Sequence, residues 1–153
     1  MLPEQEIKKS VEWGIAVCRV KKIMLACQQN ESAEDLIEAT RFMKRAMELS
    51  WQFSGTDVRR FLTLSTSIAL YCHLRCYGYV EFDRQLLLRM AKRYPRPVFG
   101  EILNSVGMLY QEHGKTKEAN QLYKQALKLL PTNHPRFNLL VSNLHSARKT
   151  SVS

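Results

Sequence analysis

The stretch Gly107–Pro131, GMLYQEHGKTKEANQLYKQALKLLP, decides the expected fold. Apolar side chains recur in it every three or four residues, which is the spacing of one helix face. Gly114 interrupts the pattern and Pro131 ends it, because glycine favours the left-handed conformation after a helix and proline cannot continue one. The stretch therefore predicts two helices joined by a tight turn, packed as an antiparallel hairpin.

The same helical spacing covers most of the 153 residues, and the alternation typical of strands is nearly absent. Ser32-Ala-Glu-Asp35 predicts a helix start, because the serine oxygen can accept an amide of the first turn. We expect an all-α fold in a single domain over 1–148, with hairpins over about 4–53, 56–95 and 98–131. A terminal helix is expected over about 135–148, followed by a frayed tail at 149–153.

An internal repeat is indicated by two glycine–proline pairs. Gly78 precedes Pro95 by the same interval as Gly114 precedes Pro131, and each pair encloses one expected helix. Residues 98–132 resemble a tetratricopeptide repeat, and the matching positions are Gly107, Tyr110, Gly114, Ala119, Tyr123, Ala126 and Pro131. The resemblance implies a right-handed solenoid of helical hairpins with a C-terminal capping helix.

The upstream units diverge from the family pattern. Tyr71, Asp83 and Met90 stand where the family has small residues. An insertion near Cys76 would instead place Ala69 at the first close approach of the two helices. The first two hairpins are therefore divergent repeats or another kind of helical hairpin.

The tetratricopeptide family binds peptides or partner helices in a groove lined by the first helix of each hairpin. Matching positions here are Glu101, Asn104, Met108 and Gln111 in the clear repeat, Ile68, Cys72 and Arg75 in the preceding one, and Lys8, Val11 and Ile15 in the first. The resemblance implies a protein-interaction adaptor or scaffold. The Lys, Asn and Arg pattern that clamps carboxylate tails of heat-shock chaperones is missing, so we expect a hydrophobic peptide or amphipathic helix instead.

The charge of the chain suggests a second surface. Lys and Arg number 23 against 14 Asp and Glu, which gives a net charge of +9. Arg89, Lys92 and Arg93 are predicted to share one helix face, with Arg84 and Arg96 beside it. Three interpretations stay open, namely a solvated helix back, an acidic protein partner and a nucleic-acid backbone. Nucleic acid is the less favoured, because no phosphate-binding loop or base-stacking motif accompanies these residues.

Other classes of function find little support in the sequence. No nucleophile lies in a recognisable catalytic motif, so we expect no catalytic or cofactor site. Cys72 and Cys76 are four residues apart, but zinc needs four ligands, and free thiols are the expectation. The chain has neither a signal peptide nor a run of about 20 apolar residues, so we expect no membrane insertion and a cytoplasmic or nuclear location. A further alternative is a structural subunit of a larger complex.

Overall fold

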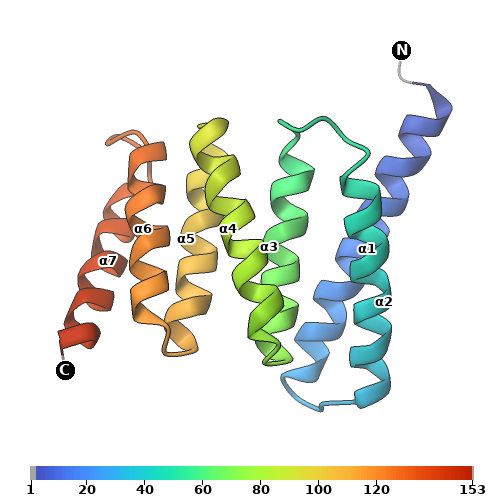
Figure 1. Ribbon diagram of the computed structural model, residues 1–153, viewed down its shortest axis with the longest axis horizontal. Coiled ribbons are helices and arrows are strands. Elements are labelled where there is room, and N and C mark those ends of the chain that lie inside the picture. Colours follow the sequence, from blue (N-terminus) through green and yellow to red (C-terminus); the bar gives the residue numbers. More distant parts are fainter. Residues whose placement is uncertain (1–2, 153) are drawn as a thin grey trace. The chain divides into compact units, whose positions relative to one another are not determined.

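A computed structural model describes residues 3–152, with side chains described for residues 3–146 (Figure 1). Within that range the chain forms seven α-helices and no strand, which confirms the predicted all-α class. The helices are α1 (Glu4–Cys27), α2 (Ala33–Ser50), α3 (Val58–His73), α4 (Tyr77–Arg93), α5 (Pro97–Glu112), α6 (Thr116–Leu129) and α7 (Phe137–Val152). Residues 149–152, predicted as a frayed tail, are thus helical, and residue 153 lies outside the described part.

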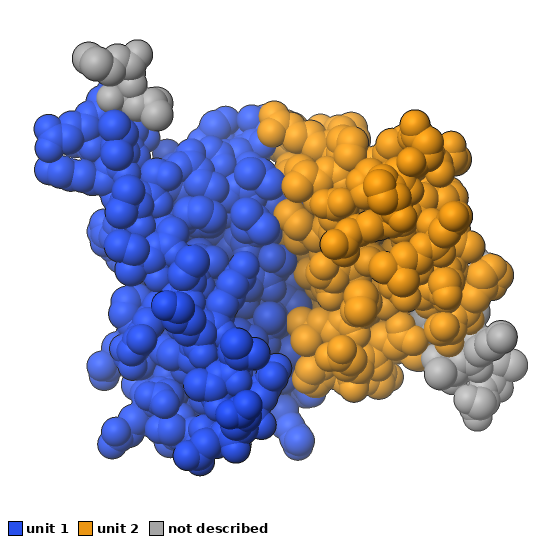
Figure 2. All heavy atoms as spheres, turned by 180° about the vertical axis from the view of Figure 1, so that it is seen from behind, with its two compact units in different colours: residues 1–77 blue, residues 78–153 orange. Residues whose placement is uncertain are grey.

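The residues separate into two compact units, 1–77 and 78–153 (Figure 2). In the first unit α1 packs against α2, and α3 packs against both of them. In the second unit α5 packs against α6, and α7 packs against α6 and α5. The predicted hairpin over 56–95 is therefore divided, with α3 in the first unit and nearly all of α4 in the second. The single domain expected over 1–148 stays a prediction.

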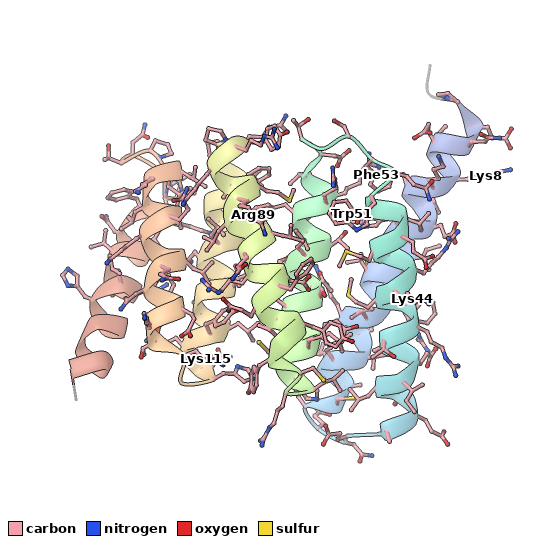
Figure 3. All side chains as sticks on the ribbon, viewed as in Figure 1. Lys8, Lys44, Trp51, Phe53, Arg89 and Lys115 are labelled. Carbon is pink, nitrogen blue, oxygen red and sulfur yellow. The ribbon has the colours of Figure 1, made fainter. Side chains whose placement is uncertain are left out.

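The first unit is held by an apolar core and by one aromatic cluster. The core lies between the inner face of α1 and residues of α2 and α3, among them Val20, Met43 and Leu70. Trp13 ties α1 to α3, because its indole N–H donates to the Thr63 hydroxyl at 2.7 Å. Its ring also meets the ring of Phe53, labelled in Figure 3, edge-on with centroids 6.1 Å apart.

Two helix starts are capped by side chains. The Ser32 hydroxyl accepts the backbone N–H of Asp35 at 3.4 Å and caps α2, as the sequence Ser-Ala-Glu-Asp indicates. Asp57 caps α3 in the same way, accepting the backbone N–H of Arg59 at 2.9 Å. Each cap satisfies one of the amides that the first helical turn leaves without an intrahelical acceptor.

The second unit contains the predicted close approach of two helices. A methyl group added at Gly107 of α5 would lie 2.5 Å from a ring carbon of Tyr123 in α6. Gly114 ends α5 with a φ of +75°, a conformation that glycine adopts without strain. Its N–H donates to the carbonyl of Gln111, and the N–H of Lys115 donates to that of Tyr110. This pair of bonds is a Schellman cap, so the turn predicted at Gly114 is present.

The turn predicted at Gly78 is wrong. The residue in the left-handed conformation after α3 is Arg75, with a φ of +57°. The N–H groups of Arg75 and Cys76 donate to the carbonyls of Cys72 and Tyr71, which is the same Schellman pattern. Gly78 lies inside the first turn of α4, where a methyl group would meet nothing within 4 Å. Arginine is uncommon at positive φ, so the residues of this turn do not predict its position.

The repeat is consequently longer than the offset from Gly78 to Gly114 indicates. The left-handed residues that correspond to each other are Arg75 and Gly114. The same interval separates the starts of α3 and α5, at Val58 and Pro97, and the starts of α4 and α6, at Tyr77 and Thr116. We call this interval the repeat offset. The register predicted for the second hairpin, 56–95, is therefore displaced by three residues, the distance from Arg75 to Gly78.

The last helix begins slightly later than expected. α7 starts at Phe137 and not at the predicted Pro135. Its start follows that of α5 at nearly the repeat offset, so α7 takes the place that the first helix of a further hairpin would have.

Candidate functional site

Two of the three groove residues predicted for the second hairpin are not available for binding. Ile68 and Cys72 are fully buried, with 0% of their surface exposed. Arg75 is exposed, but it belongs to the turn after α3 and not to a helix face. The displaced register explains the error, because three residues rotate the assigned helix face by about 60°. The assignments of Ile68 and Cys72 to a groove are therefore wrong, and that of Arg75 stays a prediction.

The repeat offset points to other positions on α3. It relates Glu101, Asn104 and Met108 of α5 to Leu62, Ser65 and Ala69 of α3. These three side chains of α3 are partly exposed, although the residues on both sides of Ser65 and Ala69 are buried. The sequence does carry a signal for this register, since Leu64 and Tyr71 recur at the repeat offset as Leu103 and Tyr110.

On α5, the four predicted groove residues have different environments. Met108 is exposed, with 43% of its surface accessible. Gln111 is half-buried, and its side-chain oxygen accepts the Tyr123 hydroxyl at 2.8 Å. Asn104 is buried, with 2% exposed, so the prediction of a free side chain at this position is wrong. Glu101 is half-buried and contacts two basic side chains described below.

Helix α7 accounts for the burial of Asn104. The side-chain N–H of Asn143 donates to the Asn104 side-chain oxygen at 3.0 Å. Just before α7, His134 lies with its Nε2 3.2 Å from a Glu101 carboxylate oxygen, and Arg136 lies 3.9 Å from the same carboxylate. The earlier residue of α5, Glu101, contacts residues 134 and 136, and the later one, Asn104, contacts residue 143. The two helices α5 and α7 therefore run parallel at this surface (Figure 1).

The tautomer of His134 follows from its two contacts. Its Nδ1 accepts the backbone N–H of Arg136 at 3.1 Å, so that nitrogen carries no proton. Nε2 then carries the proton and donates a hydrogen bond to the Glu101 carboxylate. The segment before α7 is therefore fastened to α5 by directional bonds, at one end of the surface that the two helices share.

A second exposed apolar side chain belongs to this surface. Leu139 is 48% exposed and lies three residues after Arg136 and four before Asn143, the spacing of one helix face. We call the surface the α5–α7 face; its members are Glu101, Asn104 and Met108 of α5 with His134, Arg136, Leu139 and Asn143. Met108 and Leu139 lie one turn from the bonded asparagines, on opposite sides of them along the helix direction.

Tyr123 lies behind this face, in α6. It has no exposed surface, and its hydroxyl donates to Gln111. Burial raises the pKa of Tyr123 from its ordinary value of 10.0 to about 12, and the nearby Glu112 carboxylate adds to the shift. The phenol is thus held in its neutral form, which is the form that can donate to Gln111.

The raised pKa of Tyr123 predicts a loss of stability in alkaline solution. Between about pH 10 and about pH 12 the unfolded chain has lost the phenol proton while the folded chain keeps it, so raising the pH favours unfolding. The contribution of Tyr123 to the free energy of unfolding is complete below about pH 10 and is expected to fall by up to about 2–3 kcal/mol towards pH 12. Urea unfolding at several pH values measures this fall, and Tyr123→Phe should show a shallower one; parallel curves for both proteins would contradict the assignment.

Four of the five predicted basic-surface residues are exposed. They are Arg89, Lys92, Arg93 and Arg96, of which Arg89 is labelled on α4 in Figure 3. Arg84 is different, because it is buried, with 8% exposed. Its guanidinium donates to both carboxylate oxygens of Glu81 and to the Gln121 side chain at 2.7 Å. The assignment of Arg84 to a free basic surface is therefore wrong.

The partners of Arg84 explain its charge state and its place in the fold. Hydrogen bonding to Glu81 raises the pKa of Arg84, and the same bond lowers the pKa of Glu81. By the repeat offset Arg84 corresponds to Tyr123, the aromatic residue between the helices of the clear repeat. The α4 helix thus has the ion-paired guanidinium of Arg84 at the position where α6 has the ring of Tyr123.

The cysteines of Cys72-His73-Leu74-Arg75-Cys76 do not share a helix face. Cys72 is buried within α3, whereas Cys76 is exposed after the chain has turned at Arg75. Among the residues whose side chains are described, no group of three or more His, Cys, Asp or Glu could hold a metal ion. None of the described helices has the length and apolar content required to cross a membrane.

No protein-family model matches the chain, and a search of curated proteins finds no significant match. The tetratricopeptide resemblance therefore depends on the sequence and contacts of residues 98–132 themselves.

Proposed function

We propose that the chain is a non-enzymatic protein-interaction module of the tetratricopeptide type, which binds a short peptide or an amphipathic helix of another protein on the α5–α7 face. The observation that carries this proposal is the pair of exposed apolar side chains, Met108 and Leu139, on either side of the bonded asparagines. Apolar side chains that are spaced along a helix-lined surface are the usual anchors for a bound helix or peptide.

The α5–α7 face is already ordered before a ligand binds. The bonds from Asn143 to Asn104 and from His134 to Glu101 fix the two helices relative to each other. A fixed surface spares the entropy that a mobile one would lose on binding. The contribution of the ligand would be two apolar side chains, one against Met108 and one against Leu139.

The charges around Met108 narrow the chemistry of the ligand. Glu112 follows Met108 by one helical turn and is exposed. An apolar side chain with a Lys or Arg one turn away would therefore match this end of the face. A C-terminal carboxylate would meet Glu101 and Glu112, so a chaperone carboxylate tail is not the ligand that we propose. The proposal places the interaction in the cytoplasm or the nucleus.

Replacement of Met108 by glutamate tests the proposal. Peptides would be selected from a random display library against the wild-type chain, and their affinities measured by fluorescence anisotropy. Met108→Glu is expected to weaken the selected peptides at least about tenfold, which is about 1.4 kcal/mol, because the new carboxylate replaces an apolar contact. The melting temperature should stay within about 2 °C of the wild-type value, since Met108 is exposed.

Lys124→Glu is the matched control for this experiment. Lys124 is exposed on α6 in the same unit, and the substitution changes the charge more than Met108→Glu does. It should leave the affinity of the selected peptides unchanged. Peptides that bind Met108→Glu as tightly as wild type, or that lose affinity for Lys124→Glu equally, would remove the α5–α7 face from the proposal.

A second candidate function is favoured by the outer side of α4. Phe82 is 63% exposed on the same helix as the exposed Arg89 and Arg93, which follow it by seven and eleven residues. An aromatic side chain in line with basic ones can stack a base and contact the phosphate backbone. Salt-sensitive binding of a labelled single-stranded oligonucleotide, weakened by Arg89→Glu and not by Met108→Glu, would favour this candidate over a protein ligand.

A further inference from the structure

Helix α1 has two apolar faces, and the fold uses one of them. Val20, Ile23 and Cys27 of its inner face are buried in the core of the first unit. The outer face also carries large apolar side chains, and these are exposed: Ile7 by 50%, Val11 by 56%, Ile15 by 61% and Leu25 by 67%. Single exposed apolar residues are ordinary, but four on one helix face indicate a surface that another molecule covers.

The outer face follows the spacing of a helix–helix seam. Residues 7, 11, 14, 18, 21 and 25 are separated by alternating intervals of four and three, as in a coiled coil. We call these residues, Ile7, Val11, Gly14, Cys18, Lys21 and Leu25, the outer stripe; Ile15 lies beside it. A methyl group added at Gly14 would meet nothing within 4 Å, so the space above the middle of the stripe is open to a close partner.

Charges next to the stripe are turned towards α2 on one side. The Glu12 carboxylate accepts a hydrogen bond from Arg45 at 2.7 Å, and Arg19 donates to Glu38 at 3.3 Å. Lys21 and Lys22 are exposed, and neither has an ion pair among the described residues. These two lysines leave the C-terminal half of the outer face positive.

The charge of α1 is distributed unevenly along its length. Residues 4–12 contain three Glu and two Lys, a net charge of −1, whereas residues 13–27 contain Arg19, Lys21 and Lys22, a net charge of +3. The three Glu side chains pair within the chain, Glu4 with Lys8, Glu6 with Lys9 and Glu12 with Arg45. In an antiparallel second copy, Lys21 and Lys22 lie away from their counterparts, because residue 21 of one copy is then level with residue 11 of the other. A parallel copy would place the two positive halves together, which is unfavourable.

We propose that the outer stripe is the dimer interface of the protein and that its occupant is the α1 helix of a second copy, packed antiparallel about a twofold axis that crosses the stripe between Gly14 and Cys18. The stripe is symmetric about this level of the helix. Ile7 then faces Leu25 of the second copy, Val11 faces Lys21 and Gly14 faces Cys18. A twofold interface requires such self-complementarity, because every contact occurs twice.

The small residues lie where the two helices cross. Gly14 and Cys18 of both copies meet at the axis, so the backbones can approach closely there, while the larger Ile7 and Leu25 fill the space at the ends. Ile15 and Val11 become buried beside the crossing. This interface uses α1 alone and does not depend on the α5–α7 face or on its proposed ligand.

Sedimentation equilibrium of the full 153-residue chain tests the inference. We expect a mass that rises with concentration from 17.8 kDa towards twice that value. Val11→Lys combined with Ile15→Lys is expected to raise the dissociation constant more than about 100-fold, because each new lysine at position 11 would face Lys21 of the second copy and four ammonium groups would be buried without a carboxylate partner. Both residues are exposed in the monomer, so far-ultraviolet circular dichroism should be unchanged. Leu139→Glu, an exposed apolar site on α7, is the control that should leave the dimer intact.

Charge reversal tests the antiparallel direction. Val11→Lys alone should weaken the dimer, because Val11 faces Lys21 of the second copy, and Lys21→Glu added to the same chain should restore it. A wild-type chain that stays monomeric at every concentration, or a dimer that survives Val11→Lys with Ile15→Lys, would overturn the interface. Failure of Lys21→Glu to restore the dimer of the Val11→Lys chain would overturn the antiparallel arrangement.

Discussion

Tyr123→Ala is expected to lower the free energy of unfolding by about 3–5 kcal/mol. The ring has no exposed surface and fills the space beside Gly107, so its removal leaves a cavity that the α5–α6 pair cannot close without moving a helix. The substitution also leaves the Gln111 side-chain oxygen without its donor. Urea unfolding monitored by circular dichroism measures the loss.

Phe82→Ala is the matched control for Tyr123→Ala. Phe82 is an aromatic residue of similar size in the same unit, and 63% of its surface is exposed. Its removal should change the free energy of unfolding by no more than about 0.5 kcal/mol. Equal losses for the two substitutions would mean that Tyr123 is not a core residue of the hairpin, and the resemblance of residues 98–132 to a tetratricopeptide repeat would lose its physical basis.

The hairpin of α5 and α6 can be predicted because its signals are local. Gly114 adopts the positive φ that its residue type favours, so the sequence places the turn to the residue. The preceding turn is formed by Arg75 at a φ of +57°, and nothing in the side chain of arginine predicts this conformation. Gly78 is the nearest glycine, and a turn placed there displaces the register by three residues. Ile68 is then assigned to a groove although it is buried.

The α5–α7 face can be predicted in part. Periodicity along α5 places Met108 on the outer side of the helix, because its neighbours Gly107 and Tyr110 are buried, and Gly107 faces Tyr123 of α6. The burial of Asn104 depends on Asn143, far along the chain, and on where α7 begins. That contact is set by tertiary packing, which a helical period does not encode. The place of Leu139 in this face could not be predicted either, because its exposure depends on which side of α7 packs against α5 and α6.

For α1, the sequence does not predict which of two apolar faces is buried. Ile7, Val11 and Ile15 form a periodic apolar face, and such a face ordinarily points into the core. The structure buries the opposite side of the helix, with Val17 and Val20. Both sides of α1 are apolar, so periodicity alone cannot decide between them. The packing of α2 against α1 makes that choice.

Gly107→Ala is expected to destabilise the chain by about 1–3 kcal/mol, although alanine is the better helix former by about 1 kcal/mol. The added methyl group would lie 2.5 Å and 2.8 Å from two ring carbons of Tyr123, so the ring or the helix must move. Gly78→Ala is the control, because a methyl group there meets nothing within 4 Å. It should be neutral or stabilising by up to about 1 kcal/mol. Urea unfolding of both variants measures the difference.

A double-substitution cycle identifies the cause of the Gly107→Ala loss. If the methyl group destabilises by meeting the ring, Gly107→Ala should be neutral or stabilising by up to about 1 kcal/mol in a chain that already carries Tyr123→Ala, and the coupling energy should be about 1–4 kcal/mol. If both substitutions simply add, the methyl group acts elsewhere, and Gly107 is not the position at which α5 and α6 approach each other. The cycle thus tests the contact itself, because a general loss of helix stability would leave the two effects independent.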